Sequence, residues 1–208
     1  AKTLFQDQNY DAAAKKYIEV LNAFPNYPAS VPALGELAQC YAQLKDDLMA
    51  RMVYRYIAER FSRNAALKDD AGKALLEIAG VFESQGKPEQ VDAINKLFFD
   101  KFPTHSQTPI VLYRTAESKF RAELYSEALE SYILIASNFP KAKIYLDVIN
   151  RKSICESALG DYTNAIKTLT VLIGELPPSA AMVHAIFRLA ESYRQLDQVV
   201  PAINEYAR

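Results

Sequence analysis

The sequence predicts an all-α fold in which antiparallel helix pairs repeat along the chain. The first observation is a recurring segment that places a small residue twelve positions before a closing proline. Its best copies run from Tyr10 to Pro25, Pro88 to Pro103, Tyr125 to Pro140 and Tyr162 to Pro177. The second observation is a helical segment ahead of each copy, whose own small residue always precedes the next one by twelve positions. Such self-similarity is typical of stacked helical repeats.

The two helices of each pair carry apolar stripes that follow helical spacing. In the first helix, leucine or isoleucine lies four positions before the small residue, and three copies have an aromatic residue three positions after it. In the second helix, tyrosine or leucine lies four positions after the small residue, with Asn95 as the exception. Spacings of three and four return a side chain to one helix face, so these stripes are predicted to face the core.

Glycine and proline mark the predicted ends of the helices. Gly86 and Gly160 each precede the start of a second helix and predict short loops within a pair. The closing proline cannot continue a helix and ends the second one. Residues 64–67 form a four-residue insertion, which either lengthens one connection or adds a turn to the next helix.

Composition excludes several classes of function. The net charge is −1, from 24 basic and 25 acidic residues, whereas a nucleic-acid interface needs a clear basic excess. Apolar runs are far shorter than the roughly 18 residues of a membrane span, so no membrane insertion is expected. No targeting peptide opens the chain, and its first residue is alanine. We therefore expect a processed product or a piece of a longer protein.

Candidate catalytic and metal-binding residues are few. Cys40 and Cys155 occupy equivalent register positions and are predicted to be small core residues rather than reactive thiols. His105 and His184 are interpreted as ordinary surface or helix-end residues, because no histidine or cysteine pair has metal-ligand spacing. The pairs at 46–47 and 69–70 are interpreted as aspartates at helix starts. The sequence thus predicts no enzyme, no metal and no cofactor.

The repeat pattern resembles the tetratricopeptide repeat. The likeness rests on Leu37-Ala38 with Tyr41, on Leu189-Ala190 with Tyr193, and on the Gly160-Asp161-Tyr162 turn. The chain departs from the family in lacking its tryptophan and in having a period of 37 rather than 34 residues. The longer form closed by Phe-Pro is similar to repeats of bacterial envelope proteins, such as outer-membrane assembly lipoproteins and periplasmic Tol-Pal proteins.

The resemblance implies a right-handed superhelical solenoid whose first helices line the concave side. We expect one solenoid over residues 1–208. Its repeats span approximately 1–25, 29–62, 68–103, 107–140, 144–177 and 180–208. Both ends fall within a repeat, so we expect the natural chain to be longer or its ends to be covered, for example by a second copy.

The register assigns a candidate binding site to the late concave face. Arg114, Arg151 and Arg188 recur at 37-residue intervals, where earlier copies have Glu36 and Glu77. The site comprises Tyr113, Arg114, Glu117, Phe120, Arg121, Asn150, Arg151, Phe187, Arg188, Glu191 and Arg194. Guanidinium groups pair with carboxylates and aromatic rings anchor apolar side chains, so this face suits a peptide or helix of a partner.

An alternative to a binding site is a solvent-exposed row of ion pairs, in which Arg114 pairs with Glu117, and Arg188 with Glu191, at a spacing of three.

From the repeat pattern and the arginine-lined face, the sequence predicts a non-catalytic protein-interaction scaffold that binds a peptide or helix in its concave groove. The envelope likeness suggests a role in bacterial envelope assembly, in the periplasm or at the outer membrane. Two alternatives stay open, a regulatory or substrate-selecting arm of a larger enzyme and a sensor that responds to a peptide.

Overall fold

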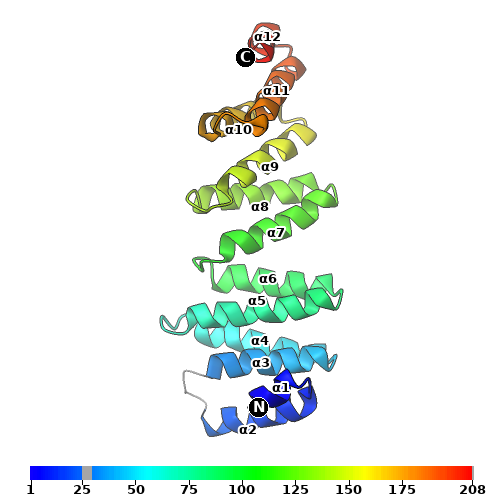
Figure 1. The fold of residues 1–208 in the computed structure, drawn as a ribbon, viewed down its shortest axis with the longest axis vertical. Coiled ribbons are helices and arrows are strands. Elements are labelled where there is room, and N and C mark those ends of the chain that lie inside the picture. The colour runs from blue at the N-terminus through cyan, green and yellow to red at the C-terminus, as the bar shows by residue number, and fades with distance from the viewer. Residues whose placement is uncertain (25–29, 208) are drawn as a thin grey trace. The chain divides into compact units, whose positions relative to one another are not determined.

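The computed structural model describes residues 1–24 and 30–207, and every regular element in those ranges is an α-helix (Figure 1). The predicted all-α fold of repeated helix pairs is thereby confirmed. Pro25 and Arg208, which close the first and last expected repeats, lie outside the described residues.

The described part of the chain forms twelve helices in an alternating series of first and second helices. They are α1 (Lys2–Gln6), α2 (Tyr10–Ala23), α3 (Ser30–Gln43), α4 (Asp47–Phe61), α5 (Lys68–Ser84), α6 (Pro88–Lys101), α7 (Thr108–Arg121), α8 (Tyr125–Asn138), α9 (Tyr145–Ala158), α10 (Tyr162–Glu175), α11 (Ala180–Gln195) and α12 (Val199–Tyr206). Odd-numbered helices are the first helices of their pairs. The chain divides into two compact units, unit 1 (Ala1–Thr108) and unit 2 (Pro109–Arg208).

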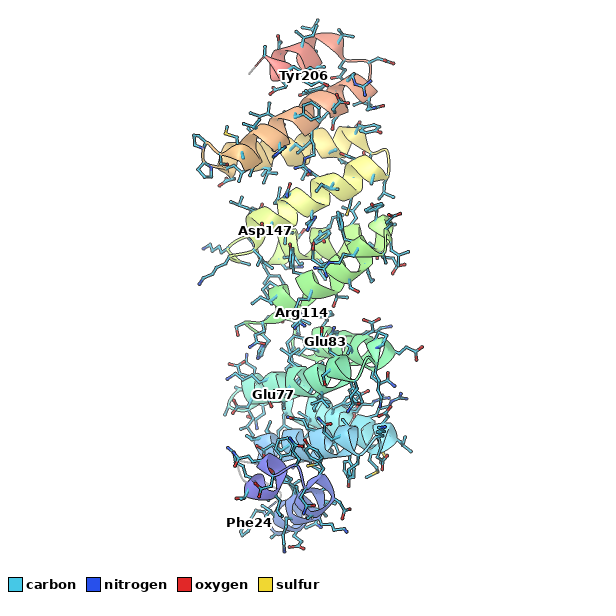
Figure 2. The ribbon with its side chains drawn as sticks, turned by 45° about the vertical axis from the view of Figure 1, so that its right-hand side comes forward. Phe24, Glu77, Glu83, Arg114, Asp147 and Tyr206 are labelled. Atoms are coloured by element: carbon cyan, nitrogen blue, oxygen red, sulfur yellow. The ribbon has the colours of Figure 1, made fainter. Side chains whose placement is uncertain are left out.

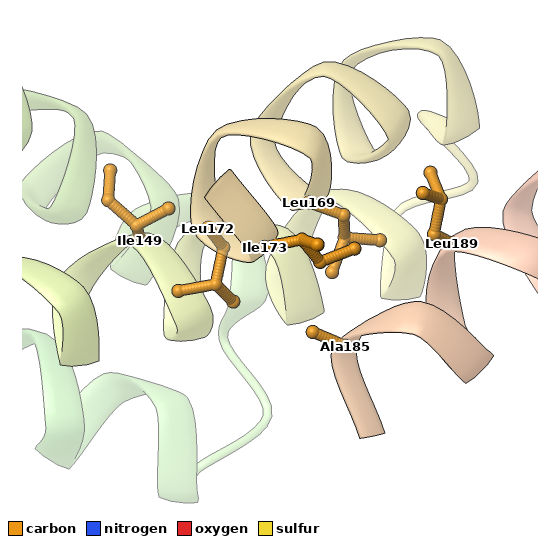
Figure 3. Packing of buried hydrophobic residues seen from close by; sticks show 6 residues of the cluster. All are labelled: Ile149, Leu169, Leu172, Ile173, Ala185 and Leu189. Atoms are coloured by element: carbon orange, nitrogen blue, oxygen red, sulfur yellow. The ribbon is translucent and has the colours of Figure 1, made fainter. Parts of the chain in front are cut away.

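From α1 to α6 in unit 1 and from α8 to α12 in unit 2, each helix packs against its neighbours in sequence. In unit 1, α3 packs against α2, α4 and α5, and α5 also packs against α6. In unit 2, α9 packs between α8 and α10, and α11 between α10 and α12. A cluster of aliphatic residues fills the space among α9, α10 and α11 (Figure 3). Its members are Ile149, Leu169, Leu172, Ile173, Ala185 and Leu189.

Small residues at the register positions are the points where helices approach most closely. Alanine there lets two helix backbones come together, and larger neighbours fill the groove beside it. Nearly all of these positions are buried, with Val91 half-buried and Ala1 exposed. The buried ones are Ala13, Ala38, Ala50, Ala79, Ala116, Ala128, Ser153, Ala165, Ala190 and Ala202.

Enlarging one register residue should overpack its contact. Ala128 lies on α8 with no exposed surface. We expect Ala128→Leu to lower the free energy of unfolding by about 1–3 kcal/mol, because the added atoms force neighbours from their rotamers. Urea denaturation followed by circular dichroism measures this loss. Ala122→Leu, at an exposed position in the turn before α8, is the matched control and should change stability little.

The turn within every helix pair uses one residue in the left-handed region. These residues are Gln8, Lys45, Gly86, Glu123, Gly160 and Asp197, with φ between 57° and 77°. Only two of them are glycine, the residue that adopts this conformation without strain. The next residue caps the second helix in three pairs, where the side chains of Asn9, Asp46 and Asp161 accept a backbone N–H.

The four-residue insertion at 64–67 lengthens helices rather than the connection. Six residues, 62–67, join α4 to α5, as many as join α6 to α7 (102–107) and α8 to α9 (139–144). Helix α4 has 15 residues and α5 has 17, whereas α3, α6, α7, α8, α9 and α10 have 14 each. The extra residues are therefore absorbed as one in α4 and three in α5. This agrees with the alternative in which a turn is added to the next helix.

Candidate functional site

The expected site residues lie on three first helices of unit 2, and we call this set the unit 2 first-helix face. It comprises Tyr113, Arg114, Glu117, Phe120 and Arg121 on α7, Asn150 and Arg151 on α9, and Phe187, Arg188, Glu191 and Arg194 on α11. Arg114, Arg121, Phe187 and Arg194 are exposed, and the other seven are half-buried. Figure 2 labels one residue on each of two of these helices, Arg114 on α7 and Asp147 on α9.

Glu117 is the centre of a contact network that joins three helices. The Tyr132 hydroxyl on α8 donates a hydrogen bond of 2.6 Å to its carboxylate. Arg151 on α9 donates through Nη2 at 3.1 Å, and its Nε lies 2.8 Å from Glu117 Oε1. The Glu117 side chain is only 12% exposed, so this cation and this hydroxyl replace much of its water.

Arg151 is further held by the aromatic residues around it. Its guanidinium carbon lies 4.6 Å from the centroid of the Phe120 ring, within the range of a cation–π contact. The Tyr113 ring packs 6.0 Å from that of Tyr132. Burial and the hydrogen bond to Glu117 raise the pKa of Tyr132, which therefore stays a neutral donor. The fork of Arg151 thus serves the packing of α7, α8 and α9.

Arg188 plays a similar part between α9 and α11. It donates to the Ser153 hydroxyl at 3.1 Å and to the side-chain oxygen of Asn150. Burial lowers the pKa of its guanidinium group. The alternative pairing of Arg188 with Glu191 is therefore wrong. Arg194 pairs with Glu191 instead, at 2.7 Å.

The same three-residue arrangement occurs twice in unit 2. Tyr113, Glu117 and Tyr132 form the first triad, in which an aromatic ring and a carboxylate of the first helix meet a tyrosine of the second. Two 37-residue periods later, Phe187, Glu191 and Tyr206 form the second, with ring centroids 5.8 Å apart and the Tyr206 hydroxyl donating to Glu191.

The hydrogen bonds from these tyrosines to glutamate were not predicted, because their spacing indicated only that they belong to the core stripe. One signal was present in the sequence. Where the first helix has glutamate one position after its small residue, the second has tyrosine, as in the two triads. The pair between them has Ile154 and Leu169 at these positions instead. In these three helix pairs the two positions are therefore either both polar or both apolar, which indicates that their side chains are in contact.

The side chains left toward solvent define what this face can bind. Phe187 exposes 56% of its surface, and the Arg194 side chain, seven positions later on α11, is 59% exposed. Arg114 and Arg121 are also exposed on α7. A flat ring beside cationic forks can hold an apolar side chain and the carboxylates that flank it.

At the register position of Arg114, the first helices α3 and α5 of unit 1 carry glutamate instead of arginine. Glu36 on α3 accepts a hydrogen bond from the Tyr17 hydroxyl of α2. Glu77 on α5 accepts a hydrogen bond of 3.2 Å from the Gln39 side chain. The difference in charge expected between early and late first helices is thus present in the two units taken separately.

His105 is buried, contrary to the interpretation of both histidines as ordinary surface or helix-end residues. It lies just ahead of α7 but is only 4% exposed, with its ring 5.3 Å from that of Phe98. Its Nε2 lies 3.1 Å from the Asp69 carbonyl oxygen, and the Gln107 N–H donates to Nδ1 at 3.2 Å. These partners fit a neutral ring protonated on Nε2. His184 is exposed near the start of α11, as predicted.

A cavity of about 230 Å³ lies next to His105 in unit 1. It is lined by Ser62, Lys68, Asp69, Lys101, Phe102, Pro103, Thr104 and His105. None of the residues expected at the binding site lines it.

Asp69 and Asp70 lie in the first turn of α5 without capping it, whereas Asp46 accepts a hydrogen bond from the Met49 N–H as the N-cap of α4.

Both cysteines are buried and free, as the sequence predicts. Burial and the nearby carboxylate of Glu36 raise the pKa of the Cys40 thiol to about 11. Burial and Glu156 raise that of Cys155 to about 11 as well. At about pH 8 we therefore expect N-ethylmaleimide to label neither thiol in the folded protein, since the thiolate is the reactive form. Mass spectrometry should find two labels only after denaturation, and rapid native labelling of either cysteine would contradict its burial.

No group of three or more His, Cys, Asp or Glu side chains within residues 1–24 and 30–207 is arranged to hold a metal ion. Over those ranges, no helix combines the length and apolar character that crossing a bilayer requires.

No family model matches the sequence, and no curated protein matches it. Solved structures do. The TPR-like repeats of a putative kinesin light chain from Podosopora anserina are 14% identical, with a TM-score of 0.50, covering 88% of this chain and 94% of that one. MamA from AMB-1 is 16% identical, with a TM-score of 0.53 and coverage of 85% and 88%. Another MamA structure is 15% identical, with a TM-score of 0.51 and coverage of 87% and 90%. At these identities the likeness shows a shared fold, a TPR-like helical repeat.

Proposed function

We propose that this chain is a non-catalytic scaffold that binds a segment of another protein on the unit 2 first-helix face. The observation that carries the proposal is the exposure of two side chains on α11, the large aromatic Phe187 at 56% and Arg194 at 59%. Aromatic residues and arginine contribute most to the energy of protein interfaces. A helical-repeat fold presents such residues on a surface of fixed spacing.

The partner segment is expected to carry acidic and apolar residues. Arg121 presents an exposed guanidinium group on α7, which suits a carboxylate of a side chain or of a chain terminus, and Arg114 adds positive charge to the same helix. Arg151 and Arg188 keep this surface in shape through their contacts with Glu117, Asn150 and Ser153, rather than being available to a ligand. The sequence likeness to envelope repeat proteins makes the bacterial periplasm or outer membrane the compartment to examine first.

The experiment has two steps. Affinity capture with the full chain, followed by mass spectrometry, identifies the partner, and calorimetry then measures binding of its segment as a synthetic peptide. We expect Arg114→Glu/Arg121→Glu and Phe187→Ser each to weaken binding about tenfold or more, equal to about 1.4 kcal/mol.

A matched control separates this site from general electrostatics. Lys141→Glu/Lys143→Glu makes the same change of charge in the connection between α8 and α9, where both side chains are exposed. This control should bind as the unaltered chain does. Circular dichroism confirms that each variant is folded. Unchanged affinity in both site variants would exclude the unit 2 first-helix face as the binding surface.

A further inference from the structure

A second surface stands out on the solvent side of α4 in unit 1. Leu48, Met52 and Tyr56 are 67%, 58% and 47% exposed. Their spacing of four residues aligns them in one row along the helix. The opposite side of α4 buries Ala50, Tyr54 and Ile57, so the exposed row is additional to the core stripe.

Arginines flank this row. Arg51 and Arg55 are exposed one position before Met52 and Tyr56, and the Arg60 guanidinium lies 5.9 Å from the Tyr56 ring centroid. One carboxylate, Glu59, is exposed three positions after Tyr56. Asp47, at the start of α4, is held by Lys87 at 2.6 Å. The face is therefore both apolar and positively charged.

The repeat does not require these residues. The positions equivalent to 48, 52 and 56 are set by their distance from the small residue of each second helix. They hold Asp11, Lys15 and Glu19 in α2; Glu89, Ala93 and Leu97 in α6; Ser126, Glu130 and Leu134 in α8; and Thr163, Lys167 and Val171 in α10. Among these five second helices, α4 alone has large apolar residues at all three positions. The fold therefore gives no reason for their exposure on α4.

We propose that the α4 outer face, comprising Leu48, Arg51, Met52, Arg55 and Tyr56, is a docking surface for an acidic amphipathic helix of a partner protein. Apolar side chains in a row with a spacing of four match the anchor residues that such a helix presents. Arg51 and Arg55 would pair with the carboxylates beside those anchors. Tyrosine, methionine and arginine are the residues enriched in protein interfaces. This surface lies on unit 1 and is separate from the proposed site on unit 2.

A protein helix fits this surface better than a lipid bilayer does. Helices that lie in a membrane surface bury a broad apolar face, and their binding grows with its area. Helix α4 offers a single row of three apolar side chains, while its remaining apolar residues pack in the core with α3 and α5. A row of this width matches the narrow seam between two packed helices.

The test uses the full chain and a designed peptide of about 18 residues, long enough to form a helix. This peptide has leucine at every third or fourth position and glutamate at most others. There are two comparison peptides. In the first, lysine replaces glutamate, and the second has the composition of the acidic peptide in scrambled order. Fluorescence anisotropy measures binding to the chain, and flotation with phosphatidylserine vesicles measures binding to lipid.

We expect the acidic amphipathic peptide to bind and the other two to bind at least about tenfold more weakly. Arg51→Glu/Arg55→Glu should weaken its binding about tenfold or more. Leu48→Asp/Met52→Lys, which installs the residues of α2 at the same positions, should do so without changing the net charge. The charge-matched control is Lys15→Glu/Lys16→Glu on α2, where both side chains are more than half exposed, and it should bind normally.

The remaining outcomes would overturn the proposal. They are equal binding of the scrambled peptide, unchanged binding by both α4 variants, and binding to vesicles that the α4 variants abolish while no peptide binds. Peptide binding that the α4 variants leave unchanged but Phe187→Ser weakens would place the peptide on the unit 2 first-helix face instead, so failure here and failure of the proposed function can be told apart.

Discussion

Replacing Glu117 by alanine should lower the free energy of unfolding of unit 2 by about 2–4 kcal/mol. The ring of Tyr132 has no exposed surface, and its hydroxyl donates to Glu117 at 2.6 Å. Without the carboxylate this hydroxyl loses its acceptor, and Arg151 loses the partner 2.8 Å from its Nε. Hydrogen exchange of the α8 and α9 amides in the full chain, measured over a range of urea concentrations, gives the loss.

The chain supplies its own control for this prediction. The double variant Glu117→Ile/Tyr132→Leu installs the pair that Ile154 and Leu169 form at the equivalent positions of α9 and α10. We expect the double variant to lose less free energy of unfolding than the sum of the losses in Glu117→Ile and Tyr132→Leu, by about 1 kcal/mol or more. The reason is that no tyrosine hydroxyl is then left without its acceptor, although Arg151 still lacks the carboxylate. Additive losses, or no loss in Glu117→Ala, would show that the contact contributes little.

Gly72→Ala should lower the free energy of unfolding of unit 1 by about 1–3 kcal/mol. A methyl group at Gly72 would lie 2.7 Å from Cδ2 of His105 and 3.2 Å from Cε2 of Phe98. The imidazole cannot easily yield, because Asp69 and Gln107 hold its two nitrogens. Hydrogen exchange of the α5 and α6 amides measures the effect in the full chain.

Gly80→Ala, on the same helix, is the matched control. A methyl group at Gly80 would meet nothing within 4 Å, and alanine favours a helix by up to about 1 kcal/mol over glycine. This variant should therefore be at least as stable as the unaltered chain. His105→Ala should also reduce the cost of Gly72→Ala. If the two alanine variants proved equally stable, the close packing of His105 over α5 would be disproved.

Repetition made the helices predictable. Small residues twelve positions apart identified both members of each pair, and nearly all of them are buried in the structure. The turns were harder to recognise, because Gln8, Lys45, Glu123 and Asp197 adopt a conformation usually taken by glycine. Each of them lies five positions before the small residue of its second helix, and this shared position, rather than side-chain chemistry, places them in the turn.

The proposed binding face was only partly predictable. The register placed its residues on first helices, because the sequence positions alone decide which side chains share one face of a helix. It could not show that Arg151 and Arg188 reach back to the preceding first helix, because this depends on the distance and offset between neighbouring helices. His105 was misjudged for the same reason, as the ring fills the space above Gly72, which lies 33 residues earlier.

The most direct test of the binding surface is photocrosslinking to the captured partner. A benzoylphenylalanine residue replaces Phe187 on α11 in one variant and Val171 on α10 in the other, two positions that are 56% and 49% exposed. A partner segment on the unit 2 first-helix face should crosslink from position 187 and not from position 171. Crosslinking from position 171 alone would place the partner on the second helices and contradict the proposed site.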